Sequence, residues 1–234
     1  IDTTGLIQCL LVSETWKVLA ENVLLKRWKG KIFEACEIGE TKVVQLLLER
    51  CNTEESGLNT RSTNGMTALM EACYYGHKDV VQLLLDHSSQ DIDINARNVS
   101  RSTSFMFACM RGHKDVVQLL LDHSDPKIQL NAKDGCGITA LMWACENGHK
   151  DVVQLLLKHS GRSIKLNAKD NYGFTALIFA CDNGYKDIVQ LLLLDPNIEL
   201  NERNCYGKTA FRIACEKEHN DIVKLLLEHR CMCC

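Results

Sequence analysis

GHKDVVQLLLDHS, at residues 76–88, is the stretch to which this chain keeps returning. The same residues recur at 112–124, and a copy with one change follows at 148–160. Altered copies begin at Gly39, Gly184 and Glu218. The second letter of the motif recurs at His77, His113, His149, Tyr185 and His219, in steps of 36, 36, 36 and 34 residues. A fixed period of this length indicates a solenoid of stacked repeats.

Each copy has the pattern of an amphipathic helix. Two Val or Ile residues and two or three Leu residues fall at helical spacing, so they form a single apolar stripe. One such helix cannot bury its stripe alone, whereas stacked copies bury it against one another. The pattern therefore predicts an all-α solenoid rather than one or two compact domains.

The composition argues against several classes of function. With 46% hydrophobic and 24% charged residues the chain is an ordinary globular sequence. Its net charge of −3 leaves no broad basic surface, so nucleic acid is not expected as a partner. No apolar run is long enough to span a bilayer, and the first residues lack the basic-then-apolar pattern of a signal peptide. Neither a membrane nor secretion is therefore expected.

The two ends suggest a fragment. The chain begins at Ile1 rather than Met, and its last repeat keeps the internal apolar pattern of the others. Terminal repeats of a solenoid need a polar outer face. We therefore expect the array to continue beyond Cys234, or to be covered by another structure.

The cysteines follow the repeat. Of thirteen, six stand at the same place in successive units, each directly after an Ala: Cys36, Cys73, Cys109, Cys145, Cys181 and Cys215. Residues a full repeat apart are too distant for a disulfide, and a small apolar residue suits a buried position. We expect these six to pack in the core, and so many free thiols indicate an intracellular protein of the cytoplasm or nucleus.

Residues 1–29 do not follow the repeat, although their apolar residues have helical spacing. IDTTGLIQCLLVSETWKVLAENVLLKRW resembles the second half of an F-box. The matching residues are Leu6, Cys9, Val12, Trp16 and Trp28. The resemblance implies docking on the small adaptor of Skp–cullin–F-box ubiquitin ligases. The alternative is a helical cap on the first repeat.

The rest of the chain, 30–234, resembles the ankyrin repeat. The most complete unit reads NGMTALMEACYYGHKDVVQLLLDH and closes with DINAR, close to the family pattern DxxGxTPLHxAAxxGHxxVVxLLL. The resemblance implies a β-turn finger, two antiparallel helices and a return loop in each unit. The units are expected at 30–61, 62–97, 98–133, 134–169, 170–203 and 204–234.

Recurring polar residues have local roles in this pattern. Thr67, Thr103, Thr139, Thr175 and Thr209 are expected to cap the first helix of each unit. Asn59, Asn95, Asn131, Asn167 and Asn201 are expected to bond neighbouring backbone. Arg101 replaces the finger glycine, which predicts a distorted finger at 98–103. Glu218 replaces the glycine between the last two helices, at a cost of about 1 kcal/mol if that position is left-handed.

No set of residues stands apart from the repeat as a catalytic site. The HKD triplet recurs with the period of the fold, which favours a structural role. The tail HRCMCC is too compact for a usual zinc site and is better explained as part of a repeat. We therefore expect no enzyme activity, no metal and no cofactor.

The resemblance places partner binding on the fingertips and on the two residues after each Ala-Cys pair. Those with apolar, aromatic or basic side chains are Met66, Tyr74, Tyr75, Met110, Arg111, Ile138, Tyr172, Phe174 and Tyr206. Fingertips have no expected part in the core, so apolar side chains there indicate binding. A basic column stands at the finger bases: Arg61, Arg97, Lys133, Lys169 and Arg203. It is either a solvated edge or a positive rail, and the rail predicts a protein partner with apolar and acidic residues.

Together these patterns predict a non-catalytic protein-interaction module. The leading hypothesis is a substrate-recognition subunit of a Skp–cullin–F-box ubiquitin ligase that holds its target in the ankyrin groove. The alternative is a plain ankyrin scaffold or inhibitor with no ligase link.

Overall fold

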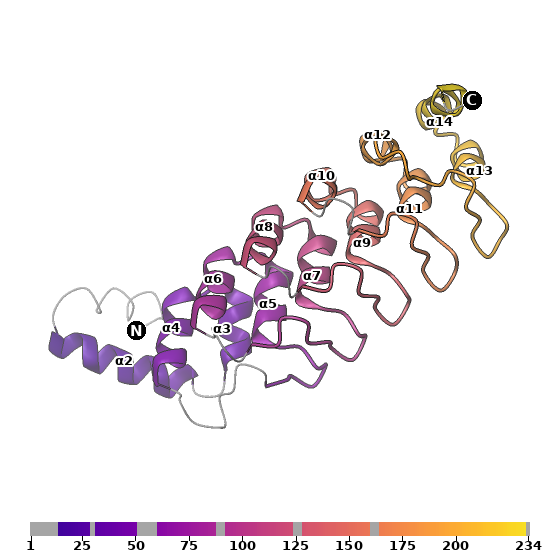
Figure 1. Ribbon diagram of the computed structural model, residues 1–234. Coiled ribbons are helices and arrows are strands. Elements are labelled where there is room, and N and C mark those ends of the chain that lie inside the picture. The colour runs from indigo at the N-terminus through magenta and orange to yellow at the C-terminus, as the bar shows by residue number, and fades with distance from the viewer. Residues whose placement is uncertain are drawn as a thin grey trace.

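The computed structural model describes residues 14–28, 31–50, 60–87, 92–123, 128–159 and 164–232. Within these ranges the chain forms α-helices and no strands. The helices stack in pairs like a staircase that runs from α3 and α4 to α13 and α14 (Figure 1). The predicted all-α solenoid is confirmed.

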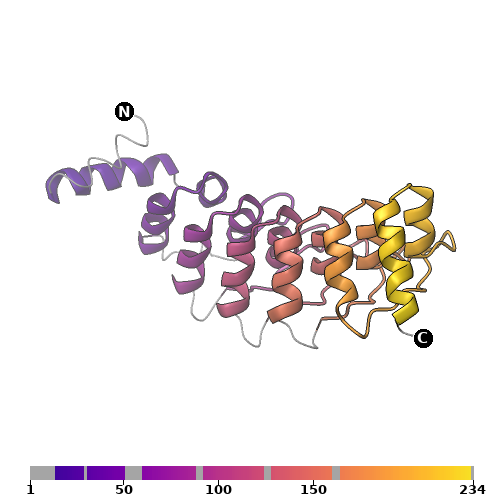
Figure 2. The ribbon, with the colours of Figure 1, turned by 90° about the horizontal axis from the view of Figure 1, so that it is seen from above.

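Two parallel rows of helices build the stack. The inner row, beside the finger loops, consists of α3 (Ile32–Ile38), α5 (Ala68–Tyr75), α7 (Ser104–Arg111), α9 (Ala140–Glu146), α11 (Ala176–Asp182) and α13 (Ala210–Glu216). The outer row consists of α4 (Thr41–Arg50), α6 (Lys78–His87), α8 (Lys114–His123), α10 (Lys150–His159), α12 (Lys186–Leu193) and α14 (Asn220–Met232). Each helix packs on its partner and on its counterparts in the neighbouring pairs (Figures 1 and 2).

Threonine caps start five of the inner helices. In α5 the Thr67 side chain accepts a hydrogen bond from the backbone N–H of Met70, at 3.3 Å. The same bond recurs at Thr103, Thr139, Thr175 and Thr209. An N-cap of this kind satisfies a backbone donor that the first turn leaves free. The predicted capping role is confirmed.

The turn between inner and outer helices needs glycine for two reasons. Gly76 has a φ of 80°, in the left-handed region that other residues rarely adopt. A Cβ on Gly76 would also come within 2.4 Å of the His113 ring of the next unit. That ring uses the space to place its Nε2 3.0 Å from the Tyr74 carbonyl oxygen, which ties the two units together. Glu218 takes the same left-handed conformation with a φ of 59°, as expected.

The column of cysteines lies in the core, with one exception. Cys36, Cys73, Cys109, Cys145 and Cys181 have no exposed surface. Burial raises the pKa of the Cys36 and Cys181 thiols to about 12 and raises the other three further, so all five stay protonated. Cys215 is exposed, so the prediction is wrong there. Its helix, α13, contacts α11 and α14, and among the described residues no further inner helix covers its other side.

The fingers are tight turns closed by two backbone hydrogen bonds. In the first complete finger Ser62 N–H donates to the Met66 carbonyl (2.9 Å) and Gly65 N–H donates to the Ser62 carbonyl (2.8 Å). The finger with Arg101 in the glycine position has the equivalent bonds, at 3.1 and 2.9 Å. The predicted distortion of this finger is wrong, because Arg101 itself adopts a left-handed φ of 62°.

Asparagines join the return loops of successive units. The Asn95 side-chain oxygen accepts from Gln129 N–H (3.0 Å), and Asn131 accepts from Lys165 N–H (2.8 Å). Asn167 accepts from Glu199 N–H at 2.9 Å. The predicted role is confirmed at these three positions but is not seen at Asn201, while Asn59 lies outside the described residues.

The N-terminal helix α2 (Glu14–Trp28) packs against α4 and projects from the stack (Figure 2). Ala20, Glu21 and Leu24 are buried, whereas Leu19 and Val23 are 53% and 43% exposed. Trp16 and Trp28 belong to the α2 backbone, and Leu6, Cys9 and Val12 lie outside the described residues. Among the helices described, none has both the length and the apolar character that crossing a bilayer requires.

Candidate partner-binding site

The fingers and the C-terminal ends of the inner helices lie together along one side of the stack, which we call the finger face (Figure 1). The finger precedes each inner helix in the chain, and side chains of the two touch. Trp143 Nε1 of α9 donates to the Asp134 carboxylate at the base of its finger, at 3.1 Å. Predicted partner-binding residues from both places therefore share one surface.

An aromatic cluster covers the finger face at α5 and α7. The Tyr74 ring meets the edges of Tyr75 and Phe107, with ring centres 5.0 and 5.6 Å away. The Arg111 guanidinium lies 4.4 Å above the Tyr74 ring, close enough for a cation–π interaction. Met66 and Met110 pack at the margin of this cluster, which is separate from the main core. Five of the predicted partner-binding residues are thus brought together.

A hollow of about 430 Å³ opens beside this cluster. It is lined by Tyr74, Tyr75, Met110, Arg111, His113, Asn147 and His149. Its two histidines are held by backbone, since His149 Nε2 lies 2.9 Å from the Met110 carbonyl oxygen and His113 bonds Tyr74 in the same way. The hollow therefore has fixed walls and presents aromatic and thioether surface to a ligand.

The fingertip residues divide into two kinds. Tyr172 and Tyr206 are 57% and 69% exposed. Ile138 is buried in the main core. Phe174 packs against this core, and the centre of its ring lies 5.2 Å from that of Phe179. The expectation that fingertips take no part in the core is therefore wrong for Ile138 and Phe174, which follow the finger glycine and turn back onto the inner helices. Phe107, Phe179 and Ile213, which share a position in successive inner helices, are buried.

The basic column forms a ladder rather than a row of free cations. Arg61 donates to the Arg97 carbonyl, Arg97 to the Lys133 carbonyl (2.8 Å) and Lys133 to the Lys169 carbonyl (2.6 Å). Lys169 donates to the Arg203 carbonyl (3.4 Å) and also pairs with Glu202. Each side chain thus ties its own unit to the next through a backbone acceptor, which gives the column a structural role without a partner.

An acidic position that sequence reasoning missed lies in the middle of the finger face. Glu146 ends α9, and in the described part of the chain its Oε2 is buried without a hydrogen-bond partner. Burial raises the pKa of the Glu146 carboxyl, and the nearby carboxylates of Asp170 and Asp134 raise it further. Both aspartates are satisfied by backbone, since Asp134 accepts from Ile138 N–H (2.9 Å) and Asp170 from Phe174 N–H (2.7 Å). Of these three described carboxylates, Glu146 is the one with a buried oxygen that accepts no hydrogen bond.

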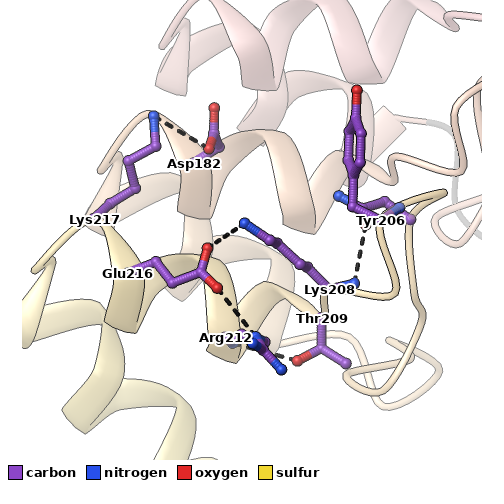
Figure 3. Close-up of polar contacts among 8 residues, drawn as sticks. Asp182, Tyr206, Lys208, Thr209, Arg212, Glu216 and Lys217 are labelled. Carbon is purple, nitrogen blue, oxygen red and sulfur yellow. Dashed lines mark hydrogen bonds and ion pairs between the residues drawn. The ribbon is translucent and has the colours of Figure 1, made fainter.

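The same position is neutralised towards the end of the stack (Figure 3). Glu216 of α13 accepts from Lys208 and from Arg212 Nε at 3.1 Å, and these hydrogen bonds lower the pKa of its carboxyl. Asp182 of α11 lies 3.5 Å from the Lys217 ammonium. Aligning the repeats by their threonine caps would have revealed the contrast, because Ile138 stands in the fourth unit where Lys208 stands in the sixth.

Comparisons with known proteins agree on one family. The family model for three ankyrin repeats matches residues 32–134 and 105–204, and the model for a single ankyrin repeat matches 206–234. The crystal structure of EF0377, an ankyrin repeat protein, is similar, with 30% sequence identity and a TM-score of 0.73. The match covers 85% of this chain and 96% of that one. No curated protein matches the chain. This chain belongs to the ankyrin-repeat family, whose members serve as protein-interaction modules.

No group of three or more His, Cys, Asp or Glu side chains among the described residues is arranged to hold a metal ion. The cysteine thiols of the inner helices are buried and protonated where the stack covers them. The arrangement suits recognition by apolar contact and charge.

Proposed function

We propose that this ankyrin stack is a non-catalytic recognition module that binds a protein partner along the finger face. The observation that carries the proposal is the exposed aromatic surface: Tyr172 and Tyr206 on the fingers are 57% and 69% exposed, and Tyr75, which is 41% exposed, lines the hollow. Tyrosine brings a large contact area with little loss of side-chain entropy, which is why it is frequent at binding hot spots.

The experiment is a selection of displayed random peptides on the purified chain, followed by calorimetry with the enriched peptides. Tyr172→Ala should weaken binding of a peptide that spans the fingertips by about 2 kcal/mol. Phe174→Ala should cost stability as well as binding, because Phe174 packs on Phe179. Failure of the selection to enrich any peptide family would contradict a recognition role for this surface.

The basic column bears on the charge of the partner. The basic column predicts acidic residues in the partner, and Lys133→Glu should then slow association and reduce its dependence on salt. The carbonyl ladder accounts for the same cations structurally. The acidic partner therefore stays a prediction that this substitution tests.

We further propose that the module serves as the target-binding part of a Skp–cullin–F-box ubiquitin ligase. The support is the F-box-like pattern of residues 1–28 together with the exposed Leu19 and Val23 of α2, an apolar surface that the stack leaves uncovered. This chain extended at its N-terminus by the first helix of an F-box should bind the purified ligase adaptor, and Trp16→Ala should weaken the binding. Absence of adaptor binding in this extended protein would leave the plain scaffold or inhibitor as the function.

A further inference from the structure

Three acidic residues at equivalent ends of inner helices have different surroundings. Asp182 and Glu216 each face a cation of the sixth unit, whereas Glu146 faces none in the described chain. All three positions that supply those cations are neutral beside Glu146, and Met142 takes the place of Arg212. Ile138 takes the place of Lys208, and Asn183 takes the place of Lys217. The middle of the finger face therefore has a negative charge that its own repeats do not compensate.

That charge opposes folding. An ionised carboxylate that is partly buried and has acidic neighbours loses hydration without gaining a partner. Residues that oppose folding in this way are expected mainly at functional sites, where binding requires them. Glutamine has almost the same size and would remove the charge, so packing does not demand the carboxylate.

The hollow reaches the residue that follows Glu146 in the chain. This residue, Asn147, is one of its walls, and Met110, the counterpart of Glu146 one unit earlier, is another. The opposite margin carries the Arg111 cation on Tyr74. A ligand thus meets a positive group, an apolar hollow and a negative group in order along the stack, and this order fixes the direction in which a charged segment can lie.

We propose that the middle of the finger face receives a segment of a partner protein that places an apolar side chain in the hollow and the adjacent Arg or Lys side chain against Glu146. The proposal rests on the recognition function above and names the chemistry of its partner. An arginine fits best, because its planar guanidinium pairs with a carboxylate through two hydrogen bonds and stacks on aromatic rings.

The test uses the peptides selected on the purified 1–234 chain. We expect enrichment of sequences in which an apolar residue precedes or follows an Arg or Lys. Glu146→Gln should raise the Kd of such a peptide about tenfold. Glu216→Gln is the matched control, since Glu216 occupies the same position but already has Lys208 and Arg212 as partners, and it should leave the Kd unchanged.

A double-mutant cycle locates the contact. Replacing the peptide's basic residue by Gln should weaken binding to the natural chain about tenfold and should have little further effect on the Glu146→Gln chain. Additive losses, or enrichment of acidic peptides whose binding ignores Glu146→Gln, would overturn this proposal while leaving the recognition function standing. No enrichment at all would overturn both. Because Glu146→Gln removes an uncompensated charge, a loss of binding cannot be attributed to unfolding.

Discussion

Ser104 shows how a single position in a repeat can depart from what packing favours. It lies at the start of α7, where the other complete units have Ala68, Ala140, Ala176 or Ala210. The side chain is buried, and in the described part of the chain its Oγ has no hydrogen-bond partner. A buried hydroxyl without a partner costs free energy that an alanine would not.

Ser104→Ala should therefore stabilise the chain by about 1 kcal/mol, a rise in Tm of about 2–4 °C. Ala140→Ser places the same hydroxyl at the equivalent buried position one unit later and should lower stability by a similar amount. Thermal unfolding followed by circular dichroism measures both. A destabilised Ser104→Ala would show that the hydroxyl has a partner after all.

Glu146 gives a prediction about pH. The pKa of its carboxyl is higher in the folded than in the unfolded chain. Its favourable contribution to the stability of the fold is therefore complete below the unfolded pKa and is lost as pH rises through the folded pKa. Glu146→Gln should therefore match the natural chain in acid and exceed it at neutral pH, by about 1–2 °C in Tm.

The pH dependence of stability has the opposite sign at Glu216, because Lys208 and Arg212 lower the pKa of its carboxyl. Its contribution is present above the unfolded pKa and is lost as pH falls. Glu216→Gln should lower Tm at neutral pH and lose this effect in acid. Parallel pH profiles for the two variants would contradict the contrast that places a partner's cation at Glu146.

At the scale of structural elements, the turn between an inner and an outer helix depends on a residue in the left-handed conformation. Glu218 pays the steric cost of a φ of 59° at the turn between α13 and α14. Glu218→Gly should stabilise the chain by about 1 kcal/mol. Gly76→Ala should do the reverse and more strongly, because its Cβ would strike the His113 ring. Urea denaturation midpoints of the two variants test the argument, and equal shifts would refute it.

The sequence predicts well those features that every repeat shares, and it predicts poorly those that differ from one repeat to the next. Thr67 and Cys73 recur in every complete unit, so their common role could be read from the period, and the caps and the buried thiols follow. Ile138, Glu146 and Cys215 differ from the average unit. The missing cation beside Glu146 can be found only by comparing the aligned units residue by residue, whereas the burial of Ile138 and the exposure of Cys215 depend on which residues face each other in the folded stack.

In the described part of the chain, the main contacts between helices join the two members of a pair and the members of neighbouring pairs, and this arrangement determines how the stack should unfold. Inner helices touch the inner helices before and after them, and outer helices do the same. In such a quasi-one-dimensional array, stability is close to a sum of unit and interface terms, so a weak central interface divides the molecule. Cys145 lies in α9 near the middle of the array, without exposed surface.

Cys145→Ala should cost about 1 kcal/mol, as expected for a small change in a packed core. Cys145→Asp buries a carboxylate between α7, α9 and α11 and should cost several times more. Because the interfaces on both sides of α9 are weakened together, we expect Cys145→Asp to unfold in two steps rather than one. Hydrogen exchange should show α9 and α10 opening first, while the outer pairs of helices keep their protection. Uniform loss of protection along the chain would mean that coupling extends beyond nearest neighbours, and the additive description of this stack would then be wrong.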